Sequence, residues 1–145
     1  MNEVKRWLKS AWVLTKQIEA NMNEIASLRT LLCKITPLYT NMPSGSHGGN
    51  WTEDMIAKIV DLEADIRRDT EKLICRVEEI RTAIDAIDDE RCRVVLTKRY
   101  LTYMKWENIA SEMNYSVKQI FRFHEKALKE ICQAGNIDNR REVRK

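Results

Sequence analysis

The sequence predicts an all-α protein in which a long antiparallel helical hairpin of coiled-coil type precedes a small helix-turn-helix domain. Of the 145 residues, 32% are charged and 7% are aromatic, with only four glycines and two prolines, a composition that suits long helices and disfavours sheets. Apolar residues recur every three or four positions along two long segments. We therefore expect a hairpin over residues 1–87, a helix-turn-helix domain over 88–134 and a basic tail over 135–145.

A first helix is expected from Val4 to Ile35, because neither glycine nor proline interrupts its apolar stripe. At about 1.5 Å per residue this helix would span roughly 45 Å, so it needs a partner along its length. The stripe consists of Val4, Trp7, Leu8, Ala11, Leu14, Ile18, Met22, Ile25, Leu28, Leu32 and Ile35.

A flexible loop is expected at residues 36–50. This segment holds both prolines and three of the four glycines, which predicts a break between two helices. We expect its His47 to be exposed, because a metal or catalytic role would lack rigid support there.

A second helix is expected from Asn50 or Thr52 to about Ile87, with an apolar stripe that is close to a heptad repeat. Asp69 and Thr70 interrupt this stripe, either as a register device or as a kink. The stripe consists of Ile56, Ile59, Leu62, Ile66, Leu73, Val77, Ile80, Ile84 and Ile87.

The two long helices most simply fold back on each other as an antiparallel hairpin. Trp12, Met55 and Val60 lie outside a two-helix seam. A four-helix bundle of two hairpins would bury them, so we expect a homo-oligomer, most simply a dimer, formed through the hairpin.

A third helix is expected to begin at the acidic residues 88–90 and to support the helix-turn-helix domain. Its supporting positions are Cys92, Val95, Leu96, Arg99 and Tyr100. Arg91, Arg93, Lys98 and Arg99 give it a basic outer side that is suited to phosphate or to solvent.

Two short helices around a tight turn are expected next, which is a helix-turn-helix signature. Trp106, Ile109, Ala110 and Met113 recur at helical spacing and form the apolar face of the first. Asn114 adopts a left-handed conformation at little cost, so we expect this helix to end at Met113 or Asn114.

Ser116 and Gln119 form a capping box at the start of the second short helix. The Ser116 hydroxyl is expected to accept a backbone N–H, while Gln119 reaches back to the cap residue. Tyr115 and Ile120 occupy the hydrophobic-staple positions. This arrangement fixes where a recognition helix begins and how it leaves the turn.

The second short helix has an apolar stripe and a face that is suited to the major groove. The stripe is Ile120, Phe123, Ala127, Leu128 and Ile131, and the opposite face holds Val117, Lys118, Phe121, Arg122 and Glu125. Arg122 suits a guanine edge and Lys118 a phosphate or base, while Phe121 or Val117 suits a thymine methyl. In the alternative interpretation Lys118 and Arg122 form only a solvated face and Phe121 belongs to the core.

Charge is distributed unevenly along the chain, although the net charge is only +3. Residues 1–50 carry six basic and three acidic side chains, residues 51–90 six and thirteen, and residues 91–145 thirteen and six. The basic last third contains the helix-turn-helix, as expected of a phosphate-binding domain, whereas the acidic middle should not touch DNA.

Neither an enzyme nor a metal or other cofactor is predicted. The sequence has no nucleophile arrangement and no glycine-rich phosphate loop before a helix. Cys33, Cys75, Cys92 and Cys132 are too widely spaced for a zinc site, and without a signal peptide we expect reduced, partly buried thiols in a cytoplasm. No apolar run reaches transmembrane length, so no membrane is expected as a partner.

The stretch from Asp88 to Ile131 resembles region four of sigma-70-type factors, through its Arg-Tyr pair at Arg99, its Ile-Ala pair at Ile109 and its Ala-Leu pair at Ala127. The whole chain is similar to phage late-gene transcription regulators of the ArpU and RinA type. The matching spellings are RYL, IA, M-x-YS and H-x-x-AL at Arg99, Ile109, Met113 and His124, with the MPSG loop at Met42 to Gly45.

This resemblance implies binding to double-stranded promoter DNA, possible contact with RNA polymerase, and activation of phage transcription in the cytoplasm of a bacterial host. Ser116 to Arg122 inherit the recognition-helix role. Two departures are Lys105, where a capping Ser or Thr is usual, and Phe121, where sigma factors commonly carry a polar side chain. The expected DNA-binding residues are Ser116, Val117, Lys118, Gln119, Phe121, Arg122, Glu125, Lys105 and Arg99.

Two other functions fit the sequence. A phage small terminase subunit also combines a helix-turn-helix with a helical hairpin, but it forms a ring on packaging DNA. A helical adaptor would instead bind a protein through the same motif and never bind DNA.

Overall fold

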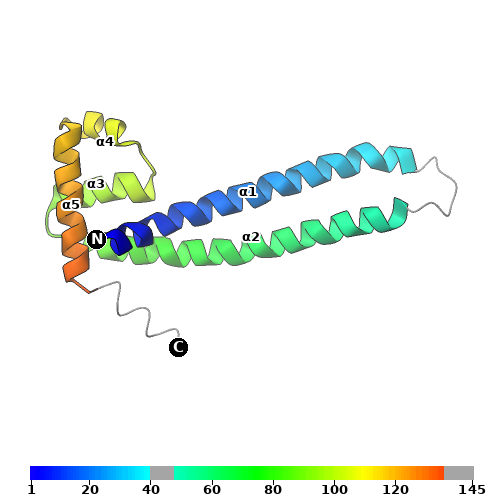
Figure 1. The fold of residues 1–145 in the computed structure, drawn as a ribbon, viewed down its shortest axis with the longest axis horizontal. Helices are drawn as coiled ribbons and strands as arrows, with labels where there is room; N and C mark the ends of the chain where they lie inside the picture. Colours follow the sequence, from blue (N-terminus) through cyan, green and yellow to red (C-terminus); the bar gives the residue numbers. More distant parts are fainter. Residues whose placement is uncertain (40–47, 136–145) are drawn as a thin grey trace. The chain divides into compact units, whose positions relative to one another are not determined.

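The computed structural model describes residues 1–39 and 48–135, and every regular element in these residues is a helix. The elements are α1 (Asn2–Tyr39), α2 (Gly48–Asp85), α3 (Glu90–Leu96), the π-helical turn η1 (Thr97–Leu101), α4 (Trp106–Met113) and α5 (Val117–Gln133) (Figure 1). The all-α class and the long N-terminal helix pair are therefore confirmed. Within the described ranges no helix has the length and apolar character needed to cross a membrane.

Two compact units divide the chain, and the division crosses both long helices. The first unit comprises Met1–Val13 and the part of the chain from Leu73 onward, and the second unit is Leu14–Lys72. The prediction placed a boundary after residue 87 instead. The helical-hairpin ends fall in the first unit because they supply part of the core beneath α3 and α5.

The core of the first unit joins α1, α2, α3 and α5. Leu8, near the start of α1, shares this core with Ile80 and Ile84, near the end of α2, so the two helices run antiparallel here. The buried members are Val4, Leu8, Ala11, Ile80, Ile84, Ile87, Cys92, Leu96, Tyr100, Ala127, Leu128 and Ile131. Burying one Leu or Ile side chain contributes about 1.5–3 kcal/mol, so this cluster is the main source of stability for the unit.

The second unit is a pair of helical segments with a narrower core. Ile25 of α1 is buried together with Ile59 and Leu62 of α2. Two ion pairs link the segments at the surface, Arg29 to Glu63 at 2.7 Å and Lys58 to Glu24 at 3.1 Å.

The apolar stripes differ from the prediction in register. Met55 is 7% exposed whereas Ile56 is 49% exposed, so the prediction was wrong for both residues. A heptad stripe alternates steps of four and three, which places Met55 four positions before Ile59. In α1 the predicted stripe residue Met22 is exposed and the neighbouring Asn21 is half-buried.

Asp69, which was predicted to interrupt the apolar stripe of α2, occupies a buried position of that stripe. Asp69 lies three residues after Ile66 and four before Leu73, so it keeps the heptad register and is 5% exposed. Its carboxylate is 3.7 Å from Nε of Arg68. Thr70 donates a 2.6 Å hydrogen bond to the carbonyl of Ile66.

Both long helices extend into the predicted loop. Helix α1 includes Pro37 and ends at Tyr39, and α2 already begins at Gly48. Proline has a φ angle compatible with a helix but removes one backbone N–H donor within it, and α1 ends two residues after Pro37. The predicted exposure of His47 and the loop at Met42 to Gly45 lie outside the described residues.

The cysteines are more exposed than predicted. Cys92 is buried, whereas Cys33, Cys75 and Cys132 are exposed free thiols. The three exposed thiols lie on the outer faces of α1, α2 and α5, away from the apolar stripes.

Candidate nucleic-acid interface

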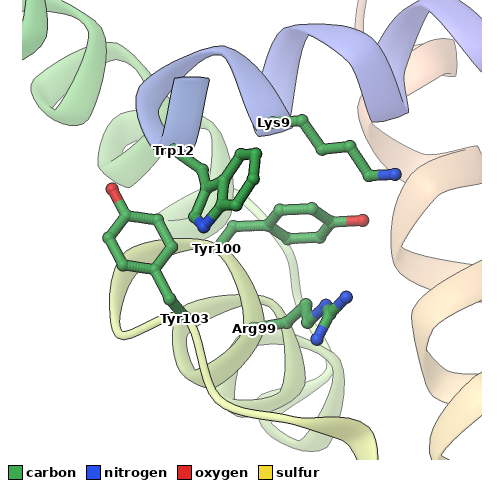
Figure 2. A pocket seen from close by; sticks show the side chains of 5 residues that line it. All are labelled: Lys9, Trp12, Arg99, Tyr100 and Tyr103. Atoms are coloured by element: carbon green, nitrogen blue, oxygen red, sulfur yellow. The ribbon is translucent and has the colours of Figure 1, made fainter. Parts of the chain in front are cut away.

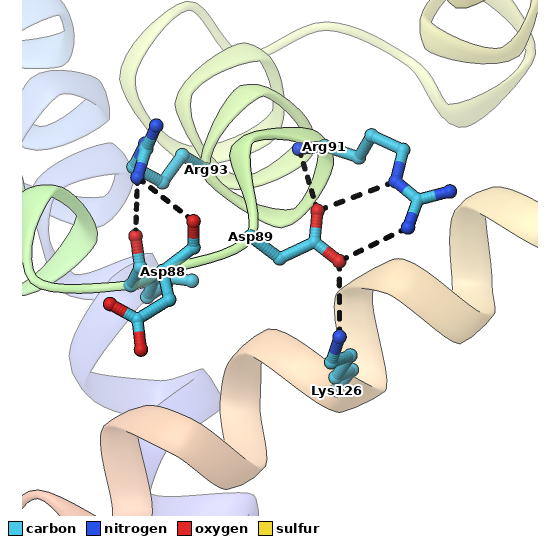
Figure 3. A network of polar contacts seen from close by, with 6 residues as sticks. Asp88, Asp89, Arg91, Arg93 and Lys126 are labelled. Atoms are coloured by element: carbon cyan, nitrogen blue, oxygen red, sulfur yellow. Dashed lines mark hydrogen bonds and ion pairs between the residues drawn. The ribbon is translucent and has the colours of Figure 1, made fainter.

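Asp89 begins the support helix and connects it to α5. Its carboxylate accepts hydrogen bonds from the backbone N–H of Arg91 at 3.0 Å and from Nζ of Lys126 at 3.0 Å, and it pairs with the Arg91 guanidinium (Figure 3). Lys126 and then Arg91 lower the pKa of Asp89 well below its usual range. This carboxylate is therefore an N-cap and an anchor for the middle of α5.

The basic side chains of the support helix make contacts within the protein. Arg93 donates to the carbonyls of Ile87 at 2.6 Å and Asp88 at 3.3 Å (Figure 3). Lys98 pairs with Glu112 of α4 at 2.5 Å. Arg93 and Lys98 were expected to be available for phosphate binding, but these contacts already engage their charged groups.

Arg99, one of the expected DNA-binding residues, is half-buried and positions the loop before α4. Its Nη1 donates a 2.9 Å hydrogen bond to the carbonyl of Met104, and its guanidinium lies 4.5 Å from the centre of the Trp106 ring. The loop needs such support because Tyr103 has a φ of 58°, a left-handed conformation that is unfavourable for a bulky residue.

Helix α4 packs against α3 and α5 through two buried apolar side chains. Ile109 and Ala110 are buried with Val95 of α3 and Ile120 of α5. Lys105 occupies the N-cap position and its side chain makes no capping hydrogen bond, as its departure from Ser or Thr suggested. Lys105 is exposed to solvent.

The turn between α4 and α5 matches the prediction. Asn114 has φ 59° and ψ 38°, the left-handed conformation expected at the end of α4. The N–H of Tyr115 donates to the carbonyl of Ala110 at 3.1 Å, and the N–H of Asn114 donates to the carbonyl of Ser111 at 3.4 Å. This is the pattern of a Schellman motif, which ends a helix and redirects the chain.

Ser116 caps α5 as predicted, because its hydroxyl accepts a 3.2 Å hydrogen bond from the N–H of Gln119. The return bond from the Gln119 side chain is absent from the hydrogen bonds of the described residues, so only half of the predicted capping box forms. The Tyr115 ring makes an edge contact with Phe123 at 5.1 Å, although Ile120 was its predicted staple partner.

The first turns of α5 expose most of the expected DNA-binding residues. Ser116, Lys118, Gln119, Phe121, Arg122 and Glu125 are exposed, whereas Val117 is half-buried beside Ile109 and Ile120. Phe121 is 43% exposed, and the centre of its ring lies 4.9 Å from the centre of the Trp106 ring. Phe121 thus combines the two predicted alternatives, since its ring contacts Trp106 of α4 and the side chain is still partly exposed to solvent.

The cations of residues 88–134 separate into two groups. Arg91, Arg93, Lys98, Arg99 and Lys126 bind carboxylates or carbonyls of the protein. In the described part of the chain, the ion pairs do not include Lys105, Lys118, Arg122 or Lys129, and all four are exposed. Three of these four are among the expected DNA-binding residues.

His124 is a residue of this site to which the sequence analysis assigned no role. Its ring is buried, 2.7 Å from the Tyr100 hydroxyl through Nε2, and it makes an edge contact with Trp106 at 4.9 Å. Burial, together with Lys5, Arg99 and Lys9, lowers the pKa of His124 to about 4. Burial raises the pKa of Tyr100 to about 12, so both groups are neutral at pH 7.

Residues 40–132 match a family model whose description is "Protein of unknown function (DUF1492)". The chain belongs to the DUF1492 family. The DUF1492 match includes α2, α3, η1 and α4 and all of α5 except its last residue, so it contains the entire helix-turn-helix, but it excludes α1. Comparisons with curated proteins and with solved structures found no significant match.

Proposed function

We propose that this DUF1492 protein is a sequence-specific regulator of transcription that binds double-stranded DNA, with α5 as the recognition helix in the major groove. The observation that carries the proposal is the turn at Asn114 and Ser116, which starts α5 so that Lys118 and Arg122 are exposed and have no ion-pair partner among the described residues. Such residues at the start of the second helix are those that contact base edges in helix-turn-helix proteins.

Each exposed side chain has a role in this proposal. Arg122 donates two N–H groups to a guanine edge, and Lys118 contacts a phosphate or a base. The exposed edge of Phe121 contacts a thymine methyl, while Ser116, Gln119 and Glu125 border the same face. Lys105 lies at the N-terminus of α4, where a phosphate would be stabilised by the helix dipole. Arg99 acts through the loop that it holds, as a positioning residue.

The proposed biological role is activation of phage late genes by recruitment of bacterial RNA polymerase. Residues 1–87 contain no segment that would melt a promoter, so the protein would act beside a polymerase that already carries its own sigma factor. This part of the proposal rests on the resemblance to region four and to the ArpU and RinA type.

A second copy of the chain is the proposed partner of the second unit. Met22, Leu31, Ile56 and Val60 are exposed apolar side chains of this unit, and burying them against a second copy would remove this apolar surface from water. A dimer places two α5 helices on paired half-sites, whereas a ring of many subunits would favour the packaging function of a small terminase subunit. Sedimentation equilibrium at micromolar concentration measures the mass of the assembly and so distinguishes a dimer from a ring of many subunits.

Fluorescence anisotropy of a labelled mixed-sequence duplex tests the DNA contact. Wild-type protein should bind with an affinity that falls with salt, and replacing Lys118 and Arg122 with Ala should reduce both the affinity and the slope of the salt dependence. Lys72→Ala removes one exposed cation of the acidic α2 segment and should leave both unchanged. Absence of binding at low salt would leave the adaptor function instead.

A further inference from the structure

The first unit contains a pocket away from the proposed DNA-contacting face of α5, which shares with the proposed interface only the positioning residue Arg99. Its volume is about 240 Å³, and Lys9, Trp12, Arg99, Tyr100 and Tyr103 line it (Figure 2). The first two residues come from α1 and the others from η1 and the loop that follows it. This volume is slightly below the range of about 300–1,000 Å³ for sites of drug-sized ligands, so the pocket suits a small molecule.

The lining of the pocket has an aromatic side and a cationic side. Figure 2 shows the rings of Trp12 and Tyr103 on one side of the Tyr100 ring. Nζ of Lys9 and the guanidinium of Arg99 lie on the other side, toward which the Tyr100 hydroxyl points. Tyr100 is 4% exposed and forms the wall between the two sides.

The cationic side lacks a balancing negative charge. No carboxylate lines the pocket among the described residues, although two cations do. The field of these cations reaches the neighbouring His124, because Arg99 and Lys9, together with Lys5, contribute to the lowering of its pKa. The Arg99 guanidinium uses Nη1 for Met104 and has further N–H groups to donate.

We propose that this pocket binds a small molecule that joins a planar ring to an anionic group. The anion lies between Lys9 and Arg99, where it accepts charge-assisted hydrogen bonds. The ring packs against Trp12 and Tyr103, which offer broad aromatic faces. Two sources share this chemistry, a nucleoside monophosphate and an aromatic carboxylic acid.

Isothermal titration calorimetry of the full-length protein tests the proposal with four probes. Adenosine 5′-monophosphate and indole-3-carboxylate each combine a ring with an anion, whereas adenosine lacks the anion and inorganic phosphate lacks the ring. We expect at least one ringed anion to bind, and more tightly than adenosine or phosphate. Binding of the nucleotide alone identifies the first source, and binding of the carboxylate alone identifies the second.

Two variants outside the core link this binding to the pocket. Lys9→Gln removes one charged donor and should weaken binding of the ringed anion about tenfold or more. Trp12→Leu should weaken the same ligand, while Lys34→Gln, an exposed cation of α1 that does not line the pocket, should not. Circular dichroism checks that each variant is folded.

Three results would overturn the proposal. They are no binding of either ringed anion at millimolar concentration, equal binding of adenosine or phosphate, or unchanged binding by both Lys9→Gln and Trp12→Leu. None of these measurements contains DNA, so they are independent of whether α5 is a recognition helix.

Discussion

The phenolic oxygen of Tyr100 lies 2.7 Å from Nε2 of His124, and this hydrogen bond joins η1 to α5 inside the first unit. Both side chains are at least 95% buried. The bond therefore fixes the helix that carries the proposed DNA-binding residues against the helix that supports it. A buried polar group that loses its partner costs more than the bond itself contributes, which makes this pair sensitive to substitution.

Tyr100→Phe should destabilise the protein by about 1–3 kcal/mol, because it leaves the buried His124 nitrogen without a partner. Urea denaturation measures the change. The double variant Tyr100→Phe with His124→Leu should lose less than the sum of the two single variants, since neither polar group then remains. Additive losses would mean that the two groups are not coupled.

Acidification should destabilise the protein through His124. The pKa of this group is about 4 in the folded protein and about 6.5 when unfolded, so the unfolded chain binds a proton first as the pH falls. Stability should therefore decline by about 2 kcal/mol between pH 7 and pH 5. The His124→Leu variant retains His47 and should lack most of this decline.

Substitution of Asp89 should separate helix capping from ion pairing. Asn can still cap α3 but cannot pair with Lys126 and Arg91, so Asp89→Asn should lower the melting temperature less than Asp89→Ala. Because the pKa of Asp89 is lowered in the folded protein, its stabilisation is present above the unfolded pKa of about 4 and is lost at lower pH. Equal melting temperatures for the two variants would show that capping contributes nothing.

The left-handed turn predicts different effects of two substitutions at Asn114. Asn114→Ala should destabilise the protein by about 1 kcal/mol, because Asn adopts the left-handed conformation more readily than Ala does. Asn114→Gly should be close to neutral. Thermal denaturation of both variants checks the order, and an Ala variant as stable as the Gly variant would contradict the assigned conformation.

The helices and the turn of the candidate interface were predictable because their signals are local. The left-handed Asn114 and the Ser116 cap follow from one residue and its nearest neighbours. The helix ends were less predictable, since α1 continues through Pro37 to Tyr39 although proline usually breaks a helix.

The remaining features depend on contacts between distant residues. Tyr100 and His124 are 24 positions apart, and no sequence pattern places a histidine opposite that tyrosine. Arg99 belongs to a basic run, but its guanidinium turns toward Met104 and Trp106.

Selection of bound sites from random duplex DNA by the full-length protein tests the central claim most directly. The proposal predicts enrichment of a defined site by the wild-type protein and by the control Lys72→Ala, with loss of that enrichment in Lys118→Ala and Arg122→Ala. A two-fold symmetric site would also indicate a dimer. Binding without any enriched sequence, or enrichment that both α5 variants retain, would contradict the assignment of α5 as a recognition helix.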